Sequence, residues 1–204
     1  MNMDVNDSLL DLIGNTPMMK LKSLDTGPCD LYVKLELNNP GGSIKDRVGL
    51  SIIEEAEKSG ELKPGGTIIE ATAGNTGIGL ALIAALKGYK IILVIPDKMS
   101  REKILPLEGL GAEIILTRSD VPEGHPEYYQ DMARKLAQET PGAFLANQFG
   151  NPANPTAHRT TTAPEIWEQM QGNIDAVVAG VGSGGTLTGL AEFFKSKDPS
   201  ICMV

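Results

Sequence analysis

Residues 67–95 read Thr-Ile-Ile-Glu-Ala-Thr-Ala-Gly-Asn-Thr-Gly-Ile-Gly-Leu-Ala-Leu-Ile-Ala-Ala-Leu-Lys-Gly-Tyr-Lys-Ile-Ile-Leu-Val-Ile. The pattern predicts a strand at Thr67–Glu70, a helix at Gly77–Leu86 that Gly88 ends, and a second strand at Lys90–Ile95. The same alternation then predicts a helix at Ser100–Leu110 that Pro106 breaks or kinks, a strand at Glu113–Thr117, a helix at Glu127–Glu139 and a strand at Ala143–Asn147. Strands alternating with helices indicate βαβ units, a parallel sheet and right-handed crossovers.

The flanking segments predict further elements. A short helix at Ser8–Ile13 and strands at Pro17–Leu21 and Leu31–Leu37 precede the alternation. Phe149–Pro155, rich in proline, asparagine and glycine, is the expected domain boundary. After it we expect a helical segment around Thr160–Gln171, a strand at Asp175–Val181, a helix at Thr186–Lys197 and a strand at Ser200–Val204. Because the chain stops inside that apolar strand, we expect a fragment, or a remaining domain that is supplied elsewhere.

Composition narrows the class of protein. The 204 residues allow one large or two small domains, and 41% hydrophobic with only 4% aromatic residues suits an α/β protein. A net charge of −8 without a basic block argues against nucleic-acid binding, and no apolar run approaches the ~20 residues of a membrane span. Met1–Asp11 is acidic and has no signal-peptide profile, so we expect a cytoplasmic protein. Cys29 and Cys202 read as reduced thiols, and His125 and His158 are too few for a histidine metal site.

Residues 38–47, Asn-Asn-Pro-Gly-Gly-Ser-Ile-Lys-Asp-Arg, combine a turn with the start of a helix. Ser43 is expected to cap a helix over Ile44–Lys58, with Asp46 as its capping-box partner. Lys45 then falls in the first helical turn. The helix dipole disfavours a cation there and lowers the pKa of the amine, which suits a nucleophile or a base. The alternative for Lys45 is a solvated surface lysine.

Two glycine-rich loops lie between a strand and a helix. In the first, residues 72–77, the backbone amides can converge on an anion, Gly74 lets a planar ligand lie close, and Asn75 offers a donor and an acceptor. A tight turn without a ligand is the alternative. The second, residues 180–186, offers amides and the hydroxyls of Ser183 and Thr186 as a neutral phosphate cradle.

The second loop also matches the G-x-G-x-x-G dinucleotide fingerprint. That fingerprint requires an acid after the next strand, whereas Asp198 precedes it, and the loop comes late in the chain. A phosphate role is therefore favoured over a nicotinamide role. An amine, an asparagine-bearing loop and a phosphate loop are the parts that pyridoxal phosphate requires, because its aldehyde forms a Schiff base with an amine.

Five ordered motifs resemble the fold-type II pyridoxal-phosphate enzymes, in the cysteine synthase and cystathionine β-synthase branch. The motifs are residues 13–17 (Ile-Gly-Asn-Thr-Pro), 39–47, 72–79, 151–155 (Asn-Pro-Ala-Asn-Pro) and 182–186. The resemblance covers the whole chain and implies two doubly wound α/β domains with parallel sheets, as in the tryptophan synthase β-subunit. Residues 43–150 would form the smaller domain, with Lys45 and the Asn75 loop. Residues 1–42 and 151–204 would form part of the larger domain, truncated, with the phosphate loop.

The resemblance also implies roles for single residues. Lys45 would bind the cofactor as a Schiff base and later remove the substrate Cα proton, and Asn75 would bond the ring oxygen. The phosphate would be held by Gly182, Ser183, Gly184, Gly185 and Thr186. The substrate carboxylate would be held by Thr72, Ala73, Gly74, Asn75, Thr76 and Gln148. Ala73 departs from the family, in which many members have serine there. Family members also continue well past residue 204, and the residue that faces the ring nitrogen lies in that further part.

The implied reaction is β-replacement of serine or O-acetylserine with a thiol or sulfide. Asn75-Thr76 stands where serine and threonine dehydratases have Asn-His, which favours replacement over deamination. The form of residues 40–47 leans toward cystathionine formation, with cysteine synthase as the alternative and a non-catalytic cofactor-binding or regulatory subunit as a further one. The implied partners are small molecules and, for a full-length protein, a second copy in a homodimer, with no nucleic acid, membrane or metal.

Two further residues, Arg47 and His158, are expected to make structural contacts. For Arg47 we expect a salt bridge to a helix acid. For His158, which follows the Asn-Pro pair, we expect a hydrogen bond to the loop backbone.

Overall fold

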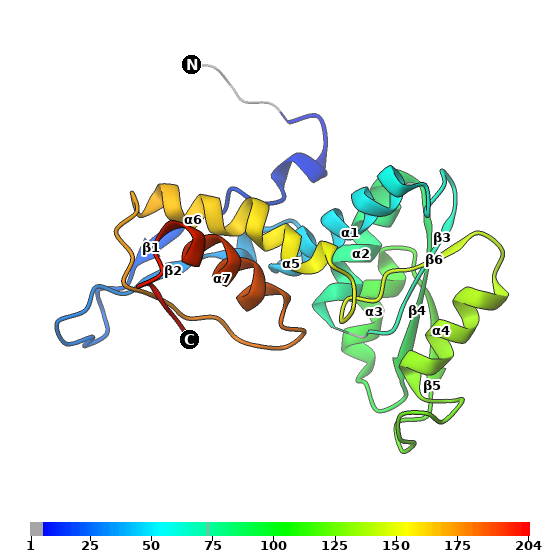
Figure 1. Ribbon diagram of the computed structural model, residues 1–204. Coiled ribbons are helices and arrows are strands. Elements are labelled where there is room, and N and C mark those ends of the chain that lie inside the picture. The colour runs from blue at the N-terminus through cyan, green and yellow to red at the C-terminus, as the bar shows by residue number, and fades with distance from the viewer. Residues whose placement is uncertain (1–5, 73) are drawn as a thin grey trace.

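The computed structural model describes residues 6–72 and 74–204, and they form two lobes (Figure 1). One lobe holds a sheet of four parallel strands in the order β5-β4-β3-β6. These strands are β3 (Thr67–Glu70), β4 (Lys90–Pro96), β5 (Glu113–Thr117) and β6 (Ala143–Leu145). The predicted βαβ alternation is confirmed, and β3 and β5 have the predicted bounds. The strand β6 is shorter than predicted, because Asn147 takes a left-handed backbone conformation with φ +47°.

Helices cover both faces of this sheet. One face packs against α1 (Lys45–Ser59), α2 (Asn75–Lys87) and α3 (Arg101–Gly109), around a core that includes Ile52, Leu80 and Leu93. The other face packs against α4 (Tyr129–Glu139), whose Ala133 meets Ile69 and Val94. The helix α3 continues through Pro106, so the predicted break at that residue is wrong.

The second lobe contains short strands and three helical segments. The strands β1 (Met18–Lys20) and β2 (Tyr32–Lys34) pair antiparallel, and β7 (Ala176–Val177) and β8 (Cys202–Met203) pair parallel. The helices are α5 (Ala153–Ala157), α6 (Ala163–Gln169), joined to α5 by a π-helical turn at His158–Thr162, and α7 (Gly185–Lys197). Two 3-10 helices, η1 (Leu9–Leu12) and η2 (Glu36–Asn38), precede α1.

Three predictions for this lobe need correction. The strand predicted over Leu31–Leu37 is shorter because η2 begins at Glu36, and the strand predicted over Asp175–Val181 is reduced to β7. The helical segment predicted from Thr160 begins at Ala153, so the expected boundary Phe149–Pro155 runs into a helix. The core here is small and consists of Ala163, Leu190, Phe194 and Ile201, with Trp167 edge-on to Phe193 and tilted against Phe194.

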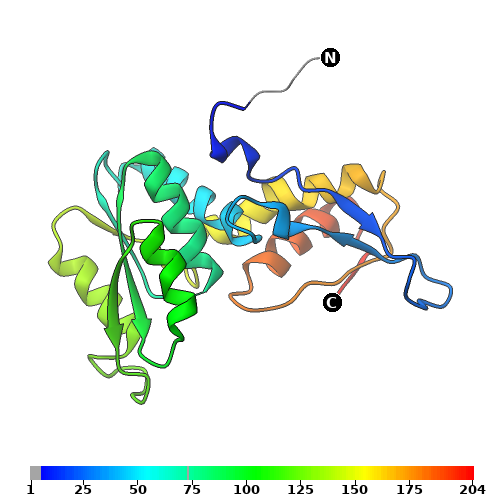
Figure 2. The same ribbon diagram turned by 180° about the vertical axis from the view of Figure 1, so that it is seen from behind.

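The lobes meet where α1 packs against α5, side by side in both views (Figures 1 and 2). The Ser51 hydroxyl on α1 donates to the Ala153 carbonyl on α5 at 2.8 Å. The helix that begins at Lys45 therefore lies at the junction. No helix in the described part of the chain is both long and apolar enough to cross a membrane.

Candidate active site

Lys45 lies in the first turn of α1, as the sequence predicts, although the helix begins at Lys45 and not at Ile44. The Ser43 hydroxyl accepts from the Lys45 amide at 3.2 Å, but the predicted capping box with Asp46 is wrong. The Asp46 carboxylate instead accepts from the Gly41 amide at 2.5 Å, because the Pro-Gly-Gly turn folds back over it. Lys45 is half-buried, burial lowers the pKa of its amine, and among the described residues this amine has no carboxylate partner. It is therefore not a solvated surface lysine.

The first glycine loop lies close to Lys45. A β-carbon on Gly79 of α2 would lie 2.7 Å from the carbonyl oxygen of Lys45, so the two helices touch at the backbone. The N-terminus of α2, which begins at Asn75, is thus held against the first turn of α1. The close contact brings the amine and the first loop to one end of the helix pair.

The first loop also borders the point where the order of the strands reverses. The chain passes from β3 to β4 and β5 and then returns to β6 on the other side of β3. Ligands of such sheets bind outside the carboxyl ends of the strands at this point. The hydroxyl of Thr76, after β3, donates to Gln148 Oε1, after β6, at 2.6 Å, and both residues are buried. Because Oε1 already accepts this bond, the side-chain nitrogen Nε2 of Gln148 remains as a donor for a ligand.

The other residues predicted for this loop differ in exposure. Gly74 and Asn75 are exposed, and Thr72 is half-buried with its hydroxyl accepting from the Gly74 amide at 3.2 Å. Ala73 lies outside the described residues.

Sequence reasoning missed Glu70, the last residue of β3. Its carboxylate is buried and accepts from the backbone amides of Ala71 at 2.9 Å and Gln148 at 3.1 Å. Burial raises the pKa of Glu70, and the bonds from Gln148 and Ala71 act against that rise. The signal in the sequence was an acid that ends an apolar strand directly before a glycine loop. Glu70 thereby joins the two segments that line the reversal point.

The second glycine loop turns at Gly184, with φ +81°, and α7 begins at Gly185. A β-carbon on Gly185 would collide with the side chain of Asn154. The side-chain nitrogen Nδ2 of Asn154 donates to the backbone carbonyl of Gln148 at 2.8 Å and to the Ser183 hydroxyl at 3.0 Å. Asn154, which sequence reasoning also missed as a site residue, connects the segment after β6 to the second loop.

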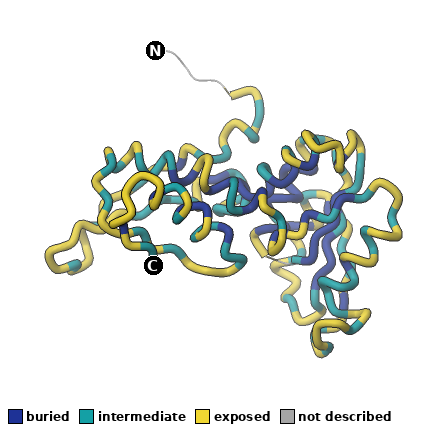
Figure 3. Tube along the Cα trace, in the orientation of Figure 1, coloured by how far each residue is buried: buried dark blue, intermediate teal, exposed yellow. Residues whose placement is uncertain are grey.

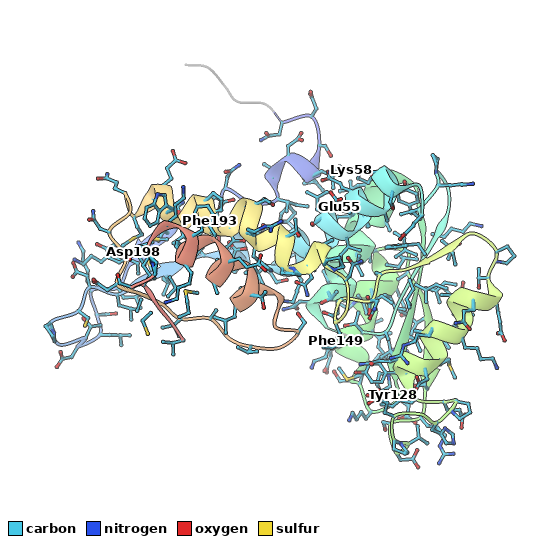
Figure 4. All side chains as sticks on the ribbon, in the orientation of Figure 1. Glu55, Lys58, Tyr128, Phe149, Phe193 and Asp198 are labelled. Atoms are coloured by element: carbon cyan, nitrogen blue, oxygen red, sulfur yellow. The ribbon has the colours of Figure 1, made fainter. Side chains whose placement is uncertain are left out.

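A pocket of about 200 Å³ opens between these segments. Residues 148–152 and 154–155 line one side of it, and residues 183–185 and 188 line the other. Figure 4 labels Phe149, a lining residue, at the junction of the lobes.

His158 packs against the second loop. Its ring is buried, Nδ1 lies 3.0 Å from the Thr162 hydroxyl, and Nε2 lies 3.2 Å from the Thr186 hydroxyl. Burial, then the positive charges of Lys45 and Arg47, lower the pKa of His158 to about 4. The predicted bond to the loop backbone is wrong, because both ring nitrogens meet side-chain hydroxyls.

Arg47 is buried two residues after Lys45 on α1. Its guanidinium pairs with Glu36 through Nε at 2.8 Å and with Glu165 through Nη1 at 2.6 Å. The predicted salt bridge between Arg47 and a helix acid is therefore confirmed, and that acid is Glu165 on α6. Neither Glu36 nor Glu165 lies on α1, the helix that carries Arg47. The network ties α1 to the second lobe.

These residues fit pyridoxal phosphate on two observations. An amine with a lowered pKa has no carboxylate partner among the described residues. The loop at the start of α7 has open space where β-carbons would stand at Gly182 and Gly184. An amine of lowered pKa and a neutral cradle of amides and hydroxyls are the donor set that a phosphorylated aldehyde needs.

Comparison with known proteins gives matches over nearly the whole chain. The family model described as "Pyridoxal-phosphate dependent enzyme" matches residues 9–204. The cystathionine beta-synthase of Apis mellifera is 48% identical over 96% of this chain and 40% of its own length. The cysteine synthase of Staphylococcus aureus is 47% identical over 97% of this chain and 63% of its own length. The chain thus spans 35–41% of the length of the cystathionine beta-synthases that it matches.

Two solved structures have the same fold over this chain. A hydrogen sulfide-producing enzyme from Fusobacterium nucleatum superposes with a TM-score of 0.91 at 44% identity, over 98% of this chain and 65% of its own. An O-ureido-L-serine synthase superposes with a TM-score of 0.91 at 40% identity, over 98% of this chain and 62% of its own.

Proposed function

The chain belongs to the family of pyridoxal-phosphate dependent enzymes, and from this premise we propose that it performs β-replacement on serine or O-acetylserine with a thiol or sulfide. The family's cofactor is pyridoxal 5'-phosphate, and the structural neighbours confirm the predicted α/β fold class, of which this chain covers a part. Relatives named cystathionine beta-synthase at 48% identity, together with the form of residues 40–47, favour cystathionine as the product. Because the chain spans only 40% of such a relative, the activity is our proposal.

The observation that carries the proposal is the backbone contact between Lys45 and Gly79, which holds the start of α1 against the helix that follows the first glycine loop. The second loop is tied to the segment after β6 through Asn154, which donates to the Ser183 hydroxyl and to the Gln148 carbonyl. Pyridoxal phosphate, when bound, supplies a conjugated ring that takes up the electron pair left at the substrate Cα. In the proposal Lys45 binds the aldehyde end of the cofactor and takes the Cα proton, which its lowered pKa favours.

The remaining roles follow from the donors at each place. Asn75 would donate to the ring oxygen, and the amides and hydroxyls of residues 182–186 would hold the phosphate. The substrate carboxylate would meet Thr72, Gly74 and Thr76 together with the side-chain amide nitrogen of Gln148. We also propose the division into a smaller domain, 43–150, and a larger one to which 1–42 and 151–204 contribute. A homodimer in the cytoplasm completes the proposal.

Cysteine synthesis is the second candidate. It is supported by the Staphylococcus aureus cysteine synthase, which is 47% identical and of which the chain covers 63%. A cofactor-binding or regulatory subunit without turnover is the third candidate.

The test is reconstitution of the chain with pyridoxal phosphate. We expect a yellow protein, borohydride fixation of the cofactor on Lys45 by peptide mapping, and turnover of serine with homocysteine. In Lys45→Ala, fixation at that position is lost and turnover falls by roughly 10²–10⁴-fold. Turnover only of O-acetylserine with sulfide would instead assign cysteine synthesis, and a yellow but silent protein would assign the non-catalytic subunit. A colourless protein, or fixation on another lysine, would reject the proposal.

A further inference from the structure

Three consecutive threonines follow His158 in the π-helical turn, and one of them behaves differently. The Thr160 hydroxyl donates to the Thr156 carbonyl at 2.8 Å, and the Thr161 hydroxyl donates to the Ala157 carbonyl at 2.6 Å. Both are the usual bond of a helical threonine to the carbonyl four residues earlier. Thr162 makes no such bond among the described residues, and its hydroxyl lies 3.0 Å from His158 Nδ1. In this contact the hydroxyl is the donor or the acceptor, depending on which ring nitrogen carries the proton.

This contact determines which nitrogen of His158 carries the proton. The ring is buried and, with a pKa lowered to about 4 by burial and by the charges of Lys45 and Arg47, it is neutral near pH 7. A neutral imidazole has one N–H donor and one acceptor. If Thr162 donates to Nδ1, the proton is on Nε2, which then donates to the Thr186 hydroxyl at 3.2 Å. The other tautomer would leave the buried Thr162 hydroxyl hydrogen without an acceptor, which is unfavourable.

The arrangement has a consequence for Thr186, the second residue of α7. A hydroxyl that accepts a bond at its oxygen keeps its own hydrogen for another acceptor. The place next to it is the N-terminus of α7, where the amides of the second glycine loop favour an anion. His158 can approach this closely because residue 189 of α7 is glycine. A β-carbon there would lie 2.9 Å from His158 Cβ and would collide with the Pro155 carbonyl.

We propose that His158 is a positioning residue which, as the Nε2–H tautomer set by Thr162, donates to Thr186 and turns the Thr186 hydroxyl hydrogen toward the phosphate in the second loop. The identity of that phosphate as the cofactor's rests on the proposed function, whereas the tautomer and the direction of the hydroxyl do not. In the proposal neither His158 nor Thr162 touches the ligand.

The tautomer is measured first, without cofactor, by 15N NMR of the histidine rings at pH 7. The chain has two histidines, so His125→Gln assigns the signals of His158. We expect a protonated Nε2 and an unprotonated Nδ1. A protonated Nδ1 would overturn the inference, and this measurement needs no variant that could fail to fold.

The consequence is measured with Thr162→Val, which keeps the shape and removes the hydroxyl. We expect the 15N chemical shifts of the His158 ring to move away from the values of a pure Nε2–H tautomer. We also expect affinity for pyridoxal phosphate to fall about tenfold, the effect of one hydrogen bond to a charged group, with affinity for phosphate-free pyridoxal unchanged. Thr160→Val, two residues earlier on an exposed hydroxyl, is the matched control and should change neither. His158→Gln, whose amide can still donate to Thr186, should keep most of the affinity that His158→Leu loses.

The outcomes separate this inference from the proposed function. Equal affinity of the wild type and Thr162→Val for pyridoxal phosphate, or an equal loss for pyridoxal, overturns the inference. If the chain binds no pyridoxal phosphate, the proposed function fails, and a titration with inorganic phosphate followed by 31P NMR takes its place. Weaker phosphate binding in Thr162→Val then supports the positioning role, and absence of phosphate binding overturns it.

Discussion

Gly79 has no side chain because the backbone of Lys45 occupies the place of a β-carbon. In Gly79→Ala the new carbon would lie 2.7 Å from the Lys45 carbonyl oxygen and 2.9 Å from its carbon. Backbone atoms cannot rotate away as a side chain can, so α1 and α2 must separate. We expect the free energy of unfolding to fall by about 1–3 kcal/mol, measured by urea denaturation, even though alanine favours the helix itself.

Gly109→Ala is the matched control for this prediction. Gly109 is also a helical residue, but no atom lies within 4 Å of its would-be β-carbon. Its replacement should stabilise the protein by up to ~1 kcal/mol through helix propensity. Equal effects of the two substitutions would mean that the helices are not in backbone contact at Lys45.

At the scale of elements, Arg47 holds three of them together. Its guanidinium joins α1 to Glu36 of η2 and to Glu165 of α6, and all three side chains are largely buried. Arg47→Met would leave the buried Glu36 without its cation and Glu165 with Lys34 alone, which costs about 3–5 kcal/mol. Lys58→Ala removes an exposed pair with Glu55 at the far end of the same helix (Figure 4) and should leave the unfolding midpoint nearly unchanged. A small loss in both variants would show that the network contributes little.

The same network predicts a pH dependence with a definite sign. Burial alone would raise the pKa of Glu165, but the bonds from Arg47 and Lys34 outweigh it and lower that pKa to about 2 from an ordinary 4.5. The folded state therefore binds fewer protons than the unfolded state between these values. The stabilisation is complete above the ordinary pKa and is lost as the pH falls toward 2, by roughly 3 kcal/mol in total. Urea midpoints of the wild type should decline through this range, and those of Arg47→Met should decline less.

The sequence predicts those elements whose signals are local. Apolar runs bounded by glycine or proline give β3, β4 and β5 within one residue, because helices cover both faces of the sheet and its strands must therefore be apolar on both faces. The run at Asp175–Val181 has the same composition, yet only Ala176 and Val177 pair as β7. Val178 is 76% exposed, which shows that a strand also needs a neighbour that the pattern does not contain.

The same limit applies to the site. Lys45 and the two glycine loops are visible in the sequence, since glycine at a turn and lysine at a helix start are local features. Glu70, Asn154 and His158 act through partners that lie 78, 29 and 28 residues away, at Gln148, Ser183 and Thr186 respectively. No periodicity or motif records such pairs, so these residues follow only from the fold.

At the scale of the whole molecule, the two lobes have unequal cores. Burial is continuous along the four-stranded sheet and its helices, whereas the lobe with β7 and β8 has a small core beside exposed segments (Figure 3). Local opening free energies follow the amount of buried apolar contact. Hydrogen exchange followed by mass spectrometry should therefore find the amides of β3 and β4 slowest, with those of β7 and β8 exchanging at least tenfold faster.

The contact between α1 and α5 determines whether the two lobes differ in hydrogen exchange. If α1 and α5 coupled the lobes into one cooperative unit, both parallel pairs would open with the same free energy, and equal protection of β3 and β7 would contradict the prediction. The Ser51 hydroxyl crosses the junction to the Ala153 carbonyl at 2.8 Å, so Ser51→Ala weakens the coupling without touching either core. We expect this variant to speed exchange in β7 and β8 while β3 and β4 stay as in the wild type. The phosphate loop lies between β7 and α7, so a ligand that holds this loop should slow exchange in β7 and β8 most.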